Sequence, residues 1–118
     1  MPTRGIYNKT TKRQLAKDFE LAADTLSRAL GIMFRRRLGR PLVFIFPSSS
    51  STSRTAIHSF FVFFPFLAVF LNERKKVVEL AVVRPWTFLY EPKRPARYLI
   101  ECGTELKRHI SVGDEIEL

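Results

Sequence analysis

Four residues of this 118-residue sequence carry side chains that an acid–base or anion-handling site requires: His58, Glu79, Arg97 and Glu101. His58 precedes a phenylalanine-rich segment, and a histidine at the mouth of a pocket acts as an acid, a base or an anion contact. Glu79 and Glu101 lie inside apolar runs, and paired carboxylates catalyse reactions when they are roughly 5–10 Å apart. One alternative is therefore a small enzyme whose cleft holds these four residues under a serine-rich loop.

Each of these side chains also has an interpretation that involves no reaction. His58 is then a half-buried residue that bonds to the backbone. Glu79 and Glu101 are then partners of Arg84 or Arg97 in salt bridges. Nothing in the sequence places the two carboxylates side by side. Catalysis is left open, and the pattern favours a protein without catalytic residues.

A run of arginines forms the strongest basic cluster. Arg35, Arg36 and Arg37 are consecutive, Arg40 follows closely, and His58 is grouped with them at the rim of the predicted pocket. Because guanidinium groups bind phosphate groups through two parallel hydrogen bonds, the cluster predicts an anionic ligand or the backbone of a nucleic acid as the partner. A solvated turn between a helix and a strand explains the same cluster without any partner.

The positive charge of the chain is concentrated in its first third. The net charge is +9, and residues 1–40 contain ten Lys and Arg against three Asp and Glu. Such an excess indicates either an anionic partner or a solubilising face. No aromatic-interleaved RNA-binding motif accompanies the basic cluster, so we expect contact with phosphates rather than with bases.

Other motifs that carry chemistry are missing from the sequence. There is no glycine-rich phosphate loop and no serine nucleophile elbow. With two histidines and one cysteine, we expect no metal site and no cofactor. Cys102 lies in an apolar run and is expected to be a buried, inert thiol, while His109 beside Lys107 and Arg108 fits the end of a short helix.

A third alternative is a structural protein that assembles into oligomers. Trp86, Phe88 and Tyr90 form an aromatic cluster within the proline-containing segment Arg84–Pro95. If these rings are exposed together, they provide an apolar interface. The sequence does not determine the oligomeric state.

The hydrophobic pattern predicts one domain over residues 1–118, built mainly of strands. Short helices are predicted over residues 26–33 and 104–109, and a flexible serine-rich loop over residues 48–54. The resulting fold class is α+β, mainly antiparallel, with the sheet closed as a small barrel because closure hides edge strands. The predicted strands cover residues 4–8, 13–17, 19–23, 42–46, 57–64, 66–71, 76–83, 97–102 and 115–118.

The most apolar segment, Ile57 to Leu71, is predicted to be core rather than membrane-spanning. Its 15 residues are too few to cross a bilayer, and they include His58 and Pro65. Within it, at least one of Phe66 and Leu67 is expected to be fully buried. The beginning of the chain lacks the apolar region of a signal peptide, so a soluble cytoplasmic protein is expected.

Several blocks, in order along the chain, resemble one known family. Gly31-Ile32-Met33-Phe34-Arg35 is similar to the glycine-leucine-methionine-phenylalanine-arginine motif of the family named domain of unknown function 192. Further blocks resemble that family at Leu42–Pro47, His58–Phe61, Phe64–Leu71, Val77–Glu79, Arg84–Trp86, Pro95–Glu101 and Val112–Asp114. The resemblance implies a small β-rich fold and no established biochemical activity.

The chain departs from the family pattern at one acidic position. The family usually has proline, an apolar residue and aspartate where this chain has Pro65, Phe66 and Leu67. An activity that depended on that aspartate would be missing here.

Overall fold

The computed structural model describes residues 5–22, 39–46, 62–87 and 90–118. Within them the chain is mostly strand, with one short 3-10 helix. The predicted α+β fold with mainly antiparallel strands is confirmed. The elements are β1 (Ile6–Asn8), β2 (Arg13–Ala16), β3 (Glu20–Ala22), β4 (Leu42–Ile45), β5 (Phe66–Leu71), β6 (Val77–Val83), β7 (Tyr98–Cys102), η2 (Thr104–His109) and β8 (Ile116–Glu117).

Three predicted segments lie wholly or largely outside the described residues. The helix expected over residues 26–33 and the serine-rich loop over residues 48–54 lie outside the described residues. Of the strand expected over residues 57–64, the structure describes only residues 62–64, and these are not in a strand. The remaining predicted strands match observed ones to within about two residues at each end, the usual uncertainty of element boundaries.

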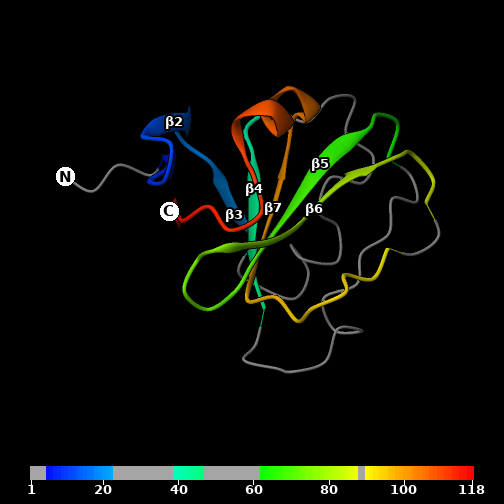
Figure 1. Ribbon diagram of the computed structural model, residues 1–118. Coiled ribbons are helices and arrows are strands. Elements are labelled where there is room, and N and C mark those ends of the chain that lie inside the picture. Colours follow the sequence, from blue (N-terminus) through cyan, green and yellow to red (C-terminus); the bar gives the residue numbers. More distant parts are fainter. Residues whose placement is uncertain (1–4, 23–38, 47–61, 88–89) are drawn as a thin grey trace.

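The strands form two sheets (Figure 1). The smaller sheet has the order β2-β1-β8, and both of its pairs are antiparallel. The larger sheet has the order β3-β4-β7-β5-β6 and is antiparallel except for the pair β3–β4, in which Glu20 lies beside Leu42. Strand β7 therefore lies in the middle of the larger sheet, between β4 and β5.

The predicted barrel is wrong for the described part of the chain. The two sheets meet at an isolated bridge between Lys76 and Glu115, and among the described strands nothing joins β2 to β3. Closure requires every strand to pair on both sides, whereas β2 ends the smaller sheet and β3 and β6 end the larger one. The smaller sheet instead stacks against the larger one.

Strand β5 separates two core clusters. All six of its residues are buried, and alternate side chains point to opposite faces of the sheet. Phe66 and Leu67 are both fully buried, which confirms the expectation that at least one of them would be. The phenylalanine-rich core, on the Phe66 face, consists of Ala22, Leu42, Phe44, Phe46, Val62, Phe66, Ala68, Phe70, Val83, Ala96 and Leu99.

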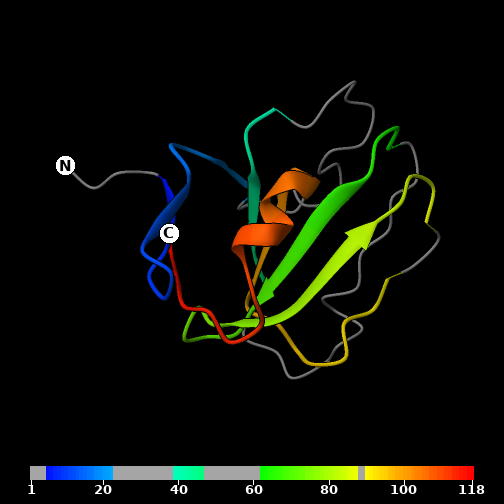
Figure 2. The same ribbon diagram turned by 45° about the horizontal axis from the view of Figure 1, so that its top comes forward.

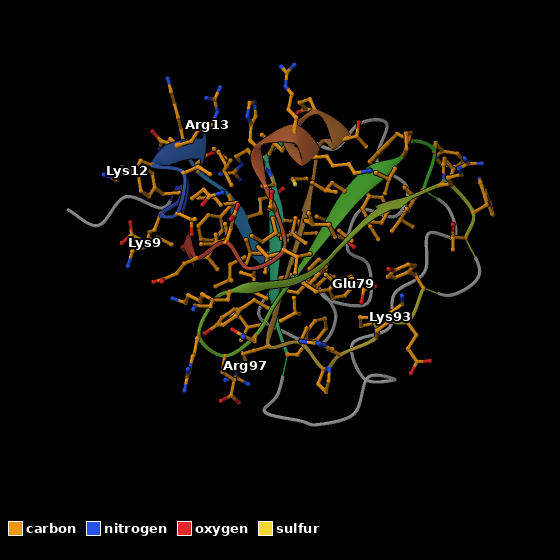
Figure 3. The ribbon with its side chains drawn as sticks, viewed as in Figure 1. Lys9, Lys12, Arg13, Glu79, Lys93 and Arg97 are labelled. Carbon is orange, nitrogen blue, oxygen red and sulfur yellow. The ribbon has the colours of Figure 1, made fainter. Side chains whose placement is uncertain are left out.

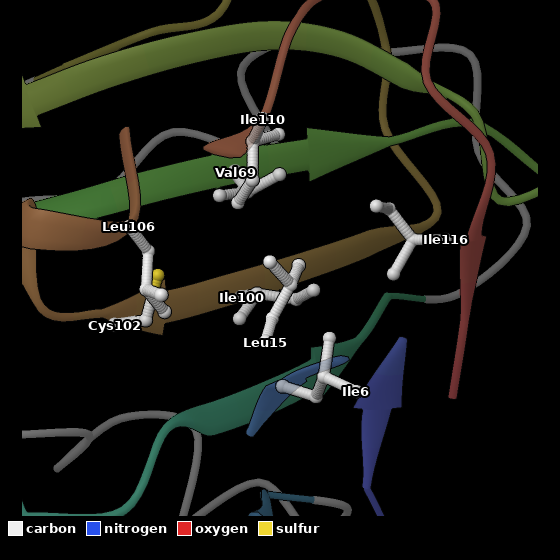
Figure 4. A pocket seen from close by; sticks show the side chains of 8 residues that line it. All are labelled: Ile6, Leu15, Val69, Ile100, Cys102, Leu106, Ile110 and Ile116. Carbon is white, nitrogen blue, oxygen red and sulfur yellow. The ribbon is translucent and has the colours of Figure 1, made fainter. Parts of the chain in front are cut away.

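The aliphatic core lies on the other face, which η2 covers (Figure 2), and it also takes residues from the smaller sheet. It consists of Ile6, Val43, Leu67, Val69, Leu71, Val77, Ile100, Cys102, Ile110 and Ile116. A cavity of about 10 Å³ remains between its side chains, lined by apolar residues from both sheets and from η2 (Figure 4). That volume is about one water probe, so the cavity is a packing gap rather than a ligand site.

A buried asparagine joins the N-terminal and C-terminal segments. The Asn8 Nδ2 group donates to Asp114 Oδ2 at 2.8 Å and to the His109 carbonyl at 3.0 Å. The Asn8 Oδ1 atom accepts from the backbone amides of Thr10 and Thr11. Asn8 is fully buried, and these bonds satisfy both ends of its amide. Strand β1 is thereby fixed to the end of η2.

In the part of the chain that the structure describes, no helix has the length and apolar character needed to cross a bilayer.

Candidate anion-binding surface

Of the predicted anion-binding residues, the structure describes Arg40 alone. Arg35, Arg36, Arg37 and His58 lie outside the described residues. The Arg40 guanidinium is half-exposed and lies 3.4 Å from Asp18 Oδ2 and 4.0 Å from Glu20 Oε1. These carboxylates offset its charge, so Arg40 is a poor anchor for a further anion.

The first carboxylate of the enzymatic alternative, Glu79, is occupied by structural bonds. It lies in β6 on the face of the phenylalanine-rich core, opposite Phe70. Its two oxygens accept from the Tyr90 hydroxyl and from the Lys93 backbone amide. Burial and this carboxylate raise the pKa of Tyr90 to about 12. Glu79 thus fixes the segment after β6 to the sheet.

The second carboxylate, Glu101, lies on the same face but in a different part of it. It is 5% exposed in β7, beside Ala68 on β5 and Leu42 on β4. Two strand spacings and two residues separate its Cα from that of Glu79, about 12 Å from standard sheet dimensions. With the Glu79 carboxylate bonded to Tyr90 and Lys93, the two acids do not form a catalytic pair.

Arg97 is directed toward a different strand from Glu79. Its guanidinium donates to the carbonyl of Phe46, which directly follows β4, while Glu79 lies on β6, three strands away in the sheet. Arg97 also lines an open pocket of about 170 Å³ with Asn72, Glu73, Pro95 and Ala96. The described part of the enzymatic constellation is therefore spread over the sheet rather than gathered in one cleft.

The aromatic residues of the oligomerisation alternative do not form one exposed cluster. Trp86 is half-exposed and contacts Phe63 edge to face, with their ring centroids 5.8 Å apart. Tyr90 stacks on Phe70 and packs against the phenylalanine-rich core. Phe88 lies outside the described residues.

The single cysteine is buried, as the sequence predicted. Cys102 is 1% exposed in the aliphatic core. Burial raises the pKa of its thiol to about 12, with smaller contributions from the Glu105 and Glu101 carboxylates. Because the thiolate is the reactive form, this thiol is not a nucleophile at neutral pH.

A basic surface forms where β2 meets η2. It consists of Lys12 in the turn before β2, of Arg13 at the start of β2, and of Lys107, Arg108 and His109 from η2. The four Lys and Arg side chains are exposed, and the described residues offer them no ion pair. Figure 3 shows Arg13 on the side of the molecule where η2 lies, with Lys93 far from it on the other side.

The positions of Arg13 and His109 are coupled through Asn8. Asn8 pairs with Arg13 in the β1–β2 ladder, and its side chain holds the His109 carbonyl. Partial removal from water, the Arg13 guanidinium and the Arg108 guanidinium lower the pKa of His109 below its ordinary value. Two arginines from opposite ends of the sequence thus act on one imidazole.

Sequence reasoning missed this surface as a site. His109, Lys107 and Arg108 were explained by the end of a helix, and they do occupy the last turn of η2. Arg13 was counted only within the charge of the first third. The pairing of β1 with both β2 and β8 brings these segments together, and no local motif encodes that pairing.

Comparison with known proteins decides the family. Residues 6–118 match the family model of DUF192, described as "Uncharacterized ACR". The chain belongs to this family. It is 34% identical to a UPF0127 protein of Pyrococcus furiosus over 95% of this chain and 96% of that protein. A UPF0127 protein of Pyrococcus abyssi is also 34% identical, over 95% of each chain. The family resemblance inferred from the ordered blocks is confirmed.

Two solved structures share the fold. A protein of unknown function from Novosphingobium aromaticivorans has a TM-score of 0.82 and 21% identity, over 97% of this chain and 84% of its own. A candidate transcription regulator from Sinorhizobium meliloti has a TM-score of 0.80 and 20% identity, over 96% of this chain and 89% of its own. At these sequence identities the similarity shows a shared fold and nothing about function.

The structure also locates the acidic position at which this chain departs from the DUF192 pattern. Leu67 is fully buried in the aliphatic core, beside Cys102 in the neighbouring strand. Its side chain points to the opposite face of the sheet from Glu79 and Glu101. An apolar residue at this position suits the apolar surroundings, where an isolated carboxylate would be costly.

Proposed function

We propose that this member of the DUF192 family is a non-catalytic binding protein for an anionic partner, and that the partner is the phosphate backbone of a nucleic acid. The observation that carries the proposal is the basic surface. Its exposed lysines and arginines converge from two distant segments and lack ion pairs among the described residues. Lys9, in the turn between β1 and β2, differs from them because its Nζ forms an ion pair with Glu115 Oε2 at 3.0 Å.

The chemistry of these side chains favours phosphate groups. Guanidinium groups bind phosphate oxygens with two parallel hydrogen bonds, and Arg13 and Arg108 supply two such groups. The net charge of +9 attracts a polyanion over a longer range. The description of the Sinorhizobium meliloti protein as a candidate transcription regulator agrees with this partner class, although 20% identity carries only the fold to this chain.

The proposed contacts are with the backbone and carry no sequence information. Arg35, Arg36 and Arg37 stay predicted contributors of further contacts, and cytoplasmic location stays a prediction. The described geometry does not favour the enzymatic alternative, since Glu79 is held by Tyr90 and Lys93.

Titration of labelled duplex and single-stranded oligonucleotides at several salt concentrations tests the proposal. Each phosphate contact on duplex DNA contributes about −0.9 to the slope of log affinity against log salt. Arg13→Ala/Arg108→Ala should therefore flatten the slope by about 1.8 and weaken all sequences alike. Arg36→Ala/Arg37→Ala reports separately on the predicted arginine cluster.

The matched control is Lys93→Ala/Arg94→Ala. It removes the same charge from two consecutive exposed residues, and Figure 3 shows Lys93 far from Arg13. This variant should keep most of the wild-type slope. Absence of binding at low salt, or an equal loss in the control, would contradict the proposal.

A further inference from the structure

His109 belongs to the basic surface, and a hydrogen bond from a buried side chain holds its backbone carbonyl. The Asn8 Nδ2 group donates to the His109 carbonyl at 3.0 Å and to Asp114 Oδ2 at 2.8 Å. Arg13 is the ladder partner of Asn8, and Arg108 precedes His109 in η2. Facing residues in such a ladder have Cα atoms about 5 Å apart, so the Arg13 side chain starts close to η2.

We propose that His109 makes phosphate binding at the basic surface pH-dependent: its imidazole takes up a proton when a phosphate group binds between Arg13 and Arg108. This inference rests on the proposed function and adds a regulation to it. The protonated imidazole then adds a third cation to the site in the complex. Phosphate oxygens then accept from three side chains instead of two.

The charges around His109 explain why the proton and the anion bind together. The Arg13 guanidinium from β2 and the Arg108 guanidinium from its own helix act on the imidazole, and Lys107 lies in the same turn of η2. Of the nearby acids, Asp114 is buried and bonded to Asn8 and to the Ser111 amide, and Glu105 lies in the first turn of η2 beside Gly103. β5, which also packs against η2, contributes apolar residues.

The direction of the effect follows from linkage. In the free protein, partial desolvation and the two guanidinium groups lower the pKa of His109. A bound phosphate group offsets the repulsion by the guanidinium groups and raises that pKa. Affinity must then rise as the pH falls through the interval between the bound and free pKa values, by about tenfold for each unit that separates them. Outside that interval the affinity is constant.

The test measures duplex oligonucleotide affinity against pH at constant salt for the wild type, His109→Gln and His58→Gln. Phosphodiester groups keep their charge where histidine titrates, so the protein alone supplies the pH dependence. Sulfate, which also keeps its charge, serves as the free tetrahedral anion and distinguishes a single-ion site from a backbone contact. An NMR titration of the His109 ring, assigned by its loss in His109→Gln, follows its pKa with and without each ligand.

We expect the wild type to bind about tenfold more tightly at the acidic end, and His109→Gln to bind with an affinity independent of pH. The His109 pKa should rise in the complex. Wild-type binding that does not change with pH would overturn the inference and leave the proposed function intact. A pH dependence that persists in His109→Gln would also overturn it, and its loss in His58→Gln would assign it to the other histidine of the chain.

Discussion

Tyr90 and Glu79 show how a side chain that looks catalytic in the sequence becomes structural. Glu79 lies in an apolar strand, which is the setting of many catalytic acids. Here its carboxylate accepts from the Tyr90 hydroxyl, and the Tyr90 ring stacks on Phe70 with centroids 6.0 Å apart. The bond joins the segment after β6 to the phenylalanine-rich core.

The Tyr90–Glu79 contact predicts a tyrosine that ionises late. The Tyr90 pKa of about 12 results first from burial and then from the hydrogen bond and charge of Glu79. Glu79→Gln should lower it, while burial keeps it above the ordinary value of about 10. Because the folded pKa is raised, the contact stabilises the fold fully below about pH 10, and that stabilisation is lost as the pH rises toward 12.

Phenolate absorbance against pH measures this shift. In a Tyr7→Phe/Tyr98→Phe background Tyr90 is the only tyrosine, since the chain has three. An unchanged Tyr90 pKa in Glu79→Gln would show that the hydrogen bond is not present in solution.

At the scale of elements, β5 contributes side chains to the cores on both faces of the larger sheet. It pairs with β6 on one side and β7 on the other, and every one of its residues is buried. Its alternation places Phe66, Ala68 and Phe70 in one core and the intervening aliphatic residues in the other. A strand with no exposed side chain gives no alternation of polar and apolar residues, so its register is determined by its neighbours.

Phe66→Ala should lower the free energy of unfolding by about 3–5 kcal/mol, because Phe66 is fully buried and the vacated space cannot collapse completely. Phe63→Ala is the matched control, since Phe63 is 58% exposed three residues earlier. Chemical denaturation of both variants compares the two costs directly. Equal costs would mean that the two rings are buried alike.

At the scale of the whole molecule, two small sheets depend on each other. The aliphatic core takes residues from both, and the bridge between Lys76 and Glu115 joins their ladders. The bonds of Asn8 with Asp114 and His109 fix the three-stranded sheet to the C-terminal segment. The sequence predicted a single domain, which stays a prediction, and these contacts support one cooperative unit.

Asn8→Ala tests this cooperativity. Loss of the amide leaves the buried Asp114 carboxylate with one donor fewer, which costs about 1–3 kcal/mol. If the sheets unfold together, hydrogen exchange should accelerate equally for the protected amides of β1 and of β5. Faster exchange confined to β1 would show that the smaller sheet opens by itself. Lys9→Ala, which removes an exposed ion pair with Glu115, should change neither.

Much of the fold was predictable because it depends on local hydrophobic pattern. The apolar runs that became β5, β6 and β7 were assigned correctly, since a strand that packs in a core must be largely apolar whatever its partners are. The short helix over residues 104–109 was also assigned correctly, although none of its residues is buried. The ordered blocks led to the correct family for a related reason, because they mark several parts of one fold. The barrel was wrong because closure depends on which edges meet, and that information is not local.

For the candidate site, too, some properties could be predicted from the sequence and others depend on the tertiary structure. The sequence by itself determined that the chain is strongly basic and mainly β, that Cys102 is inert, and that the excess positive charge belongs to the first third of the chain. Only the tertiary structure decided that Arg13 meets Arg108 and His109, and that Glu79 and Glu101 stay apart. Charge and hydrophobicity belong to each residue, whereas proximity depends on strand pairing between residues about a hundred positions apart. That pairing is decided by the packing of the whole chain.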